Sequence, residues 1–157
     1  MRRVLSILVD NQVGVLSRVT GLFSRRGYNI DSLSVGETED PSVSRITAVA
    51  RGDENVLSQI AKQVGKLIDC REIEELHPDF SVCRELALVK ITAKAKDRSE
   101  IAGIVEIFRA NIIDVSASSI TVEITGDESK IAAFMELMRP YGVISTARTG
   151  LTGLKRG

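Results

Sequence analysis

The sequence has few aromatic residues and a single histidine. Aromatic side chains make up 4 % of its 157 residues, tryptophan is absent, and His77 is the one histidine. A single histidine excludes most multi-histidine metal sites and leaves few options for a catalytic triad. The motifs GxxxxGK(S/T), GxGxxG, HExxH and GxSxG, which mark nucleotide sites, zinc proteases and serine hydrolases, are also absent. An independent enzyme is therefore disfavoured, and no catalytic residue is predicted.

The chain also has no excess of charge of either sign. Its 21 lysine and arginine residues balance 21 aspartate and glutamate residues. Without a net charge there is no general field that would attract nucleic acid or an anionic membrane. Two small basic pairs, Arg25 with Arg26 and Lys155 with Arg156, have no aromatic residues among them, and a solvated helix face and a solvated tail explain them. We therefore expect no nucleic-acid partner.

Long hydrophobic runs are missing as well. The apolar run near the beginning ends at Asp10, which makes it too short for the apolar core of a signal peptide or for a membrane span. Cys70 and Cys83 lack CxxC spacing and are compatible with a reducing compartment. These observations predict a cytoplasmic protein that does not enter a membrane.

His77 lies between the two cysteines, and this order invites a metal-binding interpretation. A solvent-exposed histidine on a connector, beside two unrelated thiols, explains the same residues more simply. We expect no metal site here, and the sequence assigns no other role to His77, Cys70 or Cys83.

Two halves of nearly equal length show the same order of predicted elements. In the first half, the helix expected at residues 15–26 carries Val15, Leu16, Val19, Leu22 and Phe23 on one face. The first half is predicted to contain a strand at 3–9, that helix, strands at 30–35 and 43–51, a helix at 54–66 and a strand at 68–76.

The second half repeats this order after a break at residues 77–80. Asp97 and Glu100 have the spacing of a capping box at the start of one helix, and Asp127 can cap a second helix that ends near Pro140. Strands are predicted at 85–93, 112–117, 120–124 and 143–149. The sequence thus predicts an α+β protein of two ferredoxin-like βαββαβ domains, residues 1–77 and residues 78–157.

Each ferredoxin-like domain leaves part of its sheet uncovered. Both helices lie on one face of the sheet, so the other face and the edge strands need a cover. Homo-oligomerisation through sheets placed side by side or back to back is the simplest expectation.

The loop before the first helix has the features of a carboxylate site. Gly14 stands where the backbone must pass tightly into the first turn, and a helix start presents unpaired N–H groups and a partial positive charge. Asn11 supplies an amide that can donate and accept, and the other side chains of residues 12–16 are mostly small or aliphatic. Together they suit a free amino acid with a short apolar side chain.

Both asparagines near this helix also have simpler explanations. Asn11 is equally well explained as a residue of a turn or helix entry. Asn29 follows Gly27 and Tyr28, where asparagine tolerates a left-handed turn. The residues alone leave the role of Asn11 open, and for Asn29 they favour the turn.

Several segments resemble one known family. The segment DNQVGVLSRVTGLFSRRGYNIDSLSVGETED at residues 10–40 resembles the N-terminal ACT domain of the regulatory, or small, subunit of acetolactate synthase, also called acetohydroxyacid synthase. Segments similar to the family's C-terminal domain are RELALVKI at 84–91, EIFRANIIDVS at 106–116, ITGDESKIAAFMELMRPYGV at 124–143 and ARTG at 147–150. The similarity extends from end to end.

The resemblance implies a subunit without catalysis of its own. Such subunits bind the large catalytic subunit, which uses thiamine diphosphate, magnesium and FAD, and raise its activity. They also confer feedback inhibition by a branched-chain amino acid, usually valine. The reaction condenses pyruvate with pyruvate or 2-oxobutyrate, the first common step toward valine, leucine and isoleucine. The resemblance implies no cofactor bound by this subunit itself.

The resemblance also implies a homodimer with a shared effector site. In the family the effector lies between the ACT domains of two chains, held by the loop before the first helix and by an asparagine of the partner. The corresponding residues here are Asn11, Gln12, Val13, Gly14, Val15 and Leu16, with Asn29 from the partner chain.

Two other classes of function remain as alternatives. An ACT-type amino-acid sensor could control a different enzyme or a transcription factor, although no DNA-reading segment is present. An enzyme built directly on the ferredoxin-like fold would need a nucleophile or metal cluster that the sequence does not offer. The sequence names neither the preferred branched-chain amino acid nor the surface that meets a large subunit.

Overall fold

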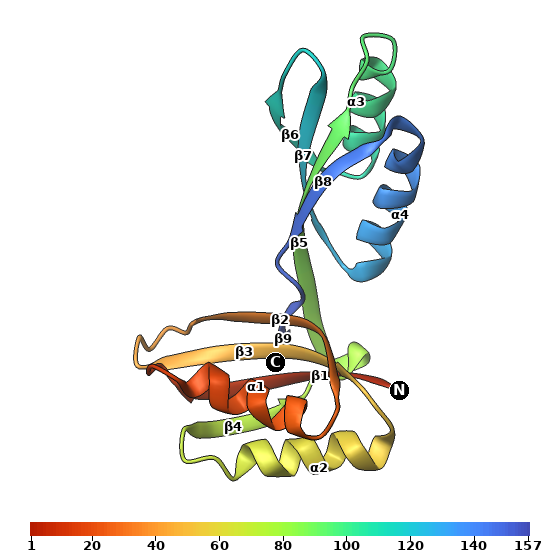
Figure 1. The fold of residues 1–157 in the computed structure, drawn as a ribbon. Coiled ribbons are helices and arrows are strands. Elements are labelled where there is room, and N and C mark those ends of the chain that lie inside the picture. Colours follow the sequence, from red (N-terminus) through yellow and green to blue (C-terminus); the bar gives the residue numbers. More distant parts are fainter. The chain divides into compact units, whose positions relative to one another are not determined.

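The computed structural model describes all 157 residues and divides them into two compact units. One unit comprises Met1–Cys83 together with Gly150–Gly157, and the other comprises Arg84–Thr149. Both contain helices and an antiparallel sheet, and the element order βαββαβ occurs twice (Figure 1). The predicted α+β class and the predicted element order are confirmed. None of the helices has both the length and the apolar content needed to cross a membrane.

The first unit has a four-stranded sheet in the order β2-β3-β1-β4. All three pairings are antiparallel, and β1 pairs with β3 along nine residues. A 3₁₀ turn at Pro78–Phe80 follows the last of these strands. The elements are β1 (Arg2–Asp10), α1 (Val15–Arg25), β2 (Asn29–Glu37), β3 (Val43–Arg51), α2 (Glu54–Gly65) and β4 (Cys70–Glu75).

The core of this unit lies between the two helices and one face of the sheet. Val15, Val19 and Phe23 of α1 are buried, and they are spaced four residues apart. This stripe is narrower than predicted, because Leu16 lies beside it and is 41 % exposed. The remaining buried members are Leu5, Ile7 and Val9 of β1, Ile46, Ala48 and Ala50 of β3, and Leu57, Ile60 and Val64 of α2.

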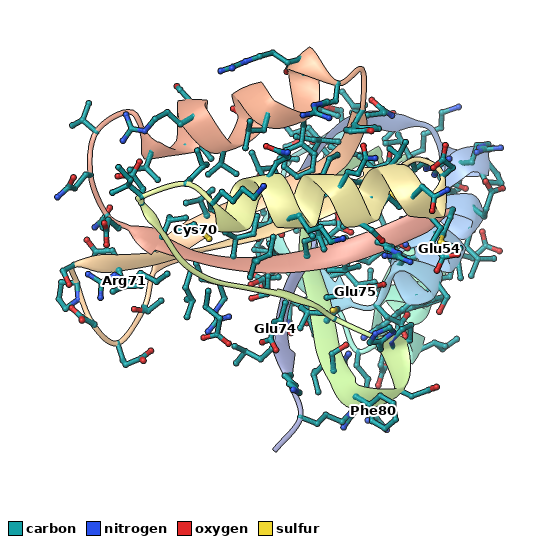
Figure 2. The ribbon with its side chains drawn as sticks, turned by 90° about the horizontal axis from the view of Figure 1, so that it is seen from below. Glu54, Cys70, Arg71, Glu74, Glu75 and Phe80 are labelled. Carbon is teal, nitrogen blue, oxygen red and sulfur yellow. The ribbon has the colours of Figure 1, made fainter.

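Charged side chains connect the strands and helices of the first unit. The guanidinium of Arg3 on β1 binds the carboxylates of Glu54, at the start of α2, and Glu75, at the end of β4, at 3.2 and 3.3 Å (Figure 2 labels both acids). The Arg3 side chain is largely buried, so the two carboxylates give its charge the partners that burial requires. The N–H of Val56 donates to Asp53, which caps α2 as predicted.

The second unit has the strand order β6-β7-β5-β8, and its core contains Ile101, Val105, Ile131, Phe134 and Met138 of the helices. These side chains meet alternate residues of the central strands β5 and β7. The elements are β5 (Ser81–Thr92), which begins in the first unit, α3 (Arg98–Ile107), β6 (Asn111–Val115), β7 (Ser119–Gly126), α4 (Glu128–Met138) and β8 (Val143–Arg148).

Two predicted helix starts in the second unit differ in outcome. Asp127 caps α4 by accepting the Lys130 N–H, and this hydrogen bond lowers the pKa of the Asp127 carboxyl. The predicted capping box at Asp97 does not form, since the Asp97 side chain makes no capping bond. Glu100 instead accepts the hydroxyl of Tyr141, and the bond raises the pKa of that phenol.

An ion pair between a buried glutamate and a half-exposed arginine joins two strands of the second unit. Arg148 of β8 donates from Nε and Nη2 to the two carboxylate oxygens of Glu85 on β5, at 2.6 and 3.0 Å. The Glu85 side chain is only 4 % exposed, so the bidentate partner offsets the cost of burying its charge. The same hydrogen bond raises the pKa of Arg148.

The end of the chain returns to the first unit. Strand β9 (Thr152–Lys155) pairs with β5, and the Arg156 N–H donates to the Phe80 carbonyl at 2.7 Å. This segment lies over the face of the first sheet that α1 and α2 leave open, and Lys155 reaches Glu74 of β4 at 3.8 Å (Figures 1 and 2). We call residues 150–157 the C-terminal segment. Part of the face that was expected to need a partner is thus covered by the chain itself.

The compact units therefore begin and end elsewhere than the predicted ranges 1–77 and 78–157. The difference lies in residues 78–83 and in the C-terminal segment, which all belong to the first unit. The cause is the pairing of β9 with the beginning of β5, because two strands far apart in the chain must lie together to form it.

The C-terminal segment should be sensitive to a single added methyl group. A Cβ atom on Gly153 would lie 2.7 Å from both Cys83 Sγ and Leu76 Cδ1, so Gly153→Ala must displace a packed neighbour. We expect it to lower the free energy of unfolding by about 1–3 kcal/mol, the usual cost of overpacking. Urea denaturation measures this change.

The matched control is Gly36→Ala on β2, where an added Cβ has nothing within 4 Å. It should change the free energy of unfolding by less than about 0.5 kcal/mol. Equal urea midpoints of unfolding for Gly153→Ala and Gly36→Ala would show that Gly153 is not closely packed in solution.

Candidate functional site

The loop between β1 and α1 is shaped by one glycine. Gly14 adopts the left-handed conformation, with φ of 84°, and is the residue before the helix. The Val15 N–H closes a turn with the Gln12 carbonyl at 3.4 Å, and the Arg18 N–H donates to the Gly14 carbonyl. The backbone N–H groups of Val13, Gly14, Leu16 and Ser17 make no hydrogen bond within the chain. The loop therefore presents several unpaired donors at a helix start, as predicted.

Three aliphatic side chains lie near these donors, and they differ in exposure. Val13 is completely exposed and Leu16 is 41 % exposed, whereas Val15 is buried in the core. The Val15 side chain anchors the helix and is not available to a ligand. A ligand at the loop would meet backbone donors together with the aliphatic surfaces of Val13 and Leu16.

Asn11 fastens this loop to the turn between β2 and β3. Its Nδ2 donates to the Pro41 carbonyl at 2.9 Å and to Glu37 Oε1 at 3.2 Å. Its backbone N–H donates to the Ser42 carbonyl at 2.8 Å. The turn role that the sequence left open for Asn11 is thus realised, and Oδ1 is the amide atom that remains for another partner.

A positive charge that the sequence analysis did not assign to the site lies over the loop. The Nη1 atom of Arg18 would be 3.2 Å from a Cβ atom on Gly14, so the glycine leaves room for the guanidinium. Asp69 forms an ion pair with Arg18, with Nε to Oδ2 at 2.7 Å. Helical side chains lean toward the N-terminus, so a basic residue four positions after the glycine could have indicated this contact.

The structure places Asn29 far from the loop of its own chain. The register pairs Asn29 with Arg51, which also faces Arg2 at the beginning of β1. The loop follows Asp10 at the other end of β1, about eight residues or roughly 26 Å along the strand. Within one chain, Asn29 and the loop therefore cannot contact the same small ligand. The Nδ2 of Asn29 donates to Asp31 Oδ1 at 3.0 Å.

The cysteines and the histidine do not form a cluster. Cys70 is at the start of β4 and Phe80 marks the turn that follows His77 (Figure 2). Burial raises the pKa of the Cys70 thiol, which disfavours the thiolate. No group of three or more histidine, cysteine, aspartate or glutamate side chains is arranged to hold a metal ion.

Two family models match the chain. The model described as "AHAS small subunit-like ACT domain" matches residues 5–72, and the model described as "Small subunit of acetolactate synthase" matches residues 84–157. Together they cover both compact units.

Curated proteins and a solved structure are similar over the full length. The chain is 49 % identical over 158 residues to the acetolactate synthase isozyme 3 small subunit of Escherichia coli. This alignment covers 100 % of this chain and 97 % of that protein. It is 47 % identical over 158 residues to the acetolactate synthase small subunit of Bacillus subtilis, covering 100 % and 92 %. The crystal structure of the acetolactate synthase small subunit from Thermotoga maritima superposes with a TM-score of 0.92 at 41 % identity, covering 100 % and 98 %.

The contact between Arg18 and Gly14 can be tested with a pair of alanine variants. Gly14 and Gly27 both have positive φ, but an added Cβ meets Arg18 at Gly14 and nothing within 4 Å at Gly27. Both alanines should lower the free energy of unfolding by about 1–2 kcal/mol, because L side chains disfavour this conformation. Gly14→Ala should lower the free energy of unfolding more than Gly27→Ala does, since it also displaces Arg18. Chemical denaturation measures the difference.

Adding Arg18→Ala to each glycine variant provides the control. The excess cost of Gly14→Ala should then disappear, because the displaced guanidinium is gone. An excess that persists would mean that the loop backbone itself, rather than Arg18, resists the side chain.

Proposed function

This chain belongs to the family of acetolactate synthase small subunits, and we propose that it is a regulatory subunit without catalysis of its own. It binds the large catalytic subunit, which carries thiamine diphosphate, magnesium and FAD, and raises its activity. It also confers feedback inhibition by valine or another branched-chain amino acid. The reaction so controlled condenses pyruvate with pyruvate or 2-oxobutyrate.

One observation supports the effector site above all others. Unpaired N–H groups at the start of α1 lie beside the guanidinium of Arg18, so backbone dipoles favour a carboxylate there, together with an arginine whose charge is shared with Asp69. The free Oδ1 of Asn11 can accept from an ammonium group. Val13 and Leu16 offer aliphatic surface for a short apolar side chain. These three elements match the three parts of valine.

A second chain completes the site in this proposal. β2 is an edge strand, so its outer backbone groups are free to pair with another copy. If two β2 strands pair antiparallel about Leu33, Asn29 of one chain comes opposite Glu37 of the other. Glu37 accepts from Asn11, so this pairing carries Asn29 to the loop that its own chain cannot reach. The homodimer thus forms through the ACT domains.

The alternative of an ACT-type sensor for a different enzyme shares the same loop. The second family model supports acetolactate synthase as the partner, because it matches residues 84–157, outside the ACT domain, and is described as "Small subunit of acetolactate synthase". The choice between them depends on the partner enzyme, which a reconstitution identifies.

We expect the purified chain alone to form no acetolactate from pyruvate. Mixed with an acetolactate synthase large subunit, it should raise the rate of acetolactate formation, and valine should lower that rate. A colorimetric assay of acetolactate measures both effects, with the large subunit alone as the control. Turnover by the chain alone, or no effect on the large subunit, would contradict the proposal.

Gly14→Asp should abolish feedback inhibition while leaving activation of the large subunit largely intact. The new carboxylate would oppose the ligand carboxylate at a helix start, where the attraction of a negative charge is ~0.3–1 kcal/mol and at most about 2 kcal/mol. Each ~1.4 kcal/mol lost weakens binding tenfold. Valine titration of the reconstituted complex measures the loss.

Gly14→Asn is the matched control, since asparagine has the same size without the charge and tolerates positive φ. It should retain more valine sensitivity than Gly14→Asp. Equal loss in the two variants would assign the effect to space and strain instead of charge. Unchanged inhibition in both would remove the loop from the site.

A further inference from the structure

We propose that the C-terminal segment positions Asn29 for the effector by holding the edge strand β2. This inference rests on the proposed function, in which Asn29 reaches the effector loop of the partner chain. The contacts that carry it join Gly150 and Leu151 to Ser32 and Ser34 of β2.

Two hydrogen bonds fasten the segment to β2. The hydroxyl of Ser34 donates to the Leu151 carbonyl at 2.8 Å, and the Leu151 N–H donates to Ser32 Oγ at 3.3 Å. Gly150 has φ of 79°, and a Cβ atom there would lie 3.1 Å from Ser32 Cβ and 3.3 Å from the Leu33 nitrogen. Because Gly150 has no side chain, the backbone of the C-terminal segment can lie directly against β2.

A β-bulge places these serines on the same face as Asn29. The register pairs Asn29 with Arg51 and Ile30 with Ala50, and then resumes with Ser32 opposite Val49. Asp31 is therefore the extra residue, with no partner on β3. Because of it, Asn29 and Ser32 point to one side of the sheet although they are three residues apart. That side is the one covered by the C-terminal segment.

Both ends of the bulge are held, and each by a different part of the chain. On one side, Asp31 accepts from Arg51 and from Asn29 Nδ2, which fixes the amide of Asn29 relative to the bulge. On the other side, Ser32 is held by Leu151. β2 is an edge strand with β3 as its one neighbour, and at the bulge Asp31 has no partner on β3. The C-terminal segment supports the strand at this place instead.

The segment is itself firmly anchored. Leu151 is 5 % exposed, Gly153 has no room for a Cβ atom beside Cys83 and Leu76, and Lys155 pairs with Glu74. A loose tail could not position a strand, whereas an anchored one can.

The test uses valine titration calorimetry on full-length dimers. In the homodimer, Ser32→Ala removes the acceptor for the Leu151 N–H. It should lower the affinity for valine roughly three- to tenfold, the effect of one lost hydrogen bond. Ser32→Thr keeps the hydroxyl and should restore normal affinity. The matched control is Ser24→Ala, an exposed serine of α1, which should bind valine normally.

A mixed dimer separates positioning from general destabilisation. One chain carries Asn11→Ala and the other carries Ser32→Ala. If Ser32 acts through Asn29 of its own chain, both lesions fall in one pocket, and half of the sites keep normal affinity. If Ser32→Ala merely loosens its own fold, the loop of that chain is affected too, and no normal site remains. That second result, or normal affinity in the Ser32→Ala homodimer, would overturn the inference.

A reference dimer of Asn11→Ala with Asn29→Ala distinguishes failure of the inference from failure of the proposed function. Half of its sites should also remain normal if the pocket is shared between chains. If the reference dimer has no normal site, the shared-site proposal is wrong. If half of the sites in the reference dimer are normal and the mixed dimer with Ser32→Ala has no normal site, only the proposed role of the C-terminal segment is wrong. Should Ser32→Ala fail to fold, Gly150→Ala replaces it, because its Cβ would push Ser32 away.

Discussion

The pairing of β3 with two long neighbours is the constraint on which the first unit depends. β3 pairs with β1 along nine residues and with β2 along nearly its whole length. This register sets the loop before α1 at one end of the sheet and Asn29 at the other. Once both strands are aligned on β3, no movement of a side chain can bring the two ends together. A small ligand that needs both must therefore lie between two chains.

Burial on both faces of β3 explains why this strand can fix the positions of its neighbours β1 and β2. Ile46 and Ala48 face the helices, and Thr47 and Val49 are equally buried on the opposite face. In an ordinary ferredoxin-like sheet the second face is open to solvent or to a partner. Here the C-terminal segment covers part of it and binds the strand that carries Asn29. The same contact contributes to the fold and, in our proposal, to the effector site.

Much of the fold could be predicted because its signals are local. Periodic apolar residues indicated the four α-helices and strands β1 to β8, but not β9, and Asp53 and Asp127 cap helices as expected. The errors arose where a side chain found a distant partner. Glu100 binds Tyr141 instead of closing a capping box with Asp97, because the tertiary fold brings the phenol within reach.

The sequence by itself determined the α+β class, the two βαββαβ repeats, the family and the loop with its unpaired donors. All of these depend on residues that are neighbours in the chain or on recognisable segments. Only the tertiary structure decided that the Asn11 amide is engaged by the β2–β3 turn, that Arg18 lies over Gly14, and that the C-terminal segment returns to the first unit. Each of these is a contact between residues whose proximity depends on strand register and packing, and neither composition nor periodicity encodes which distant groups will meet.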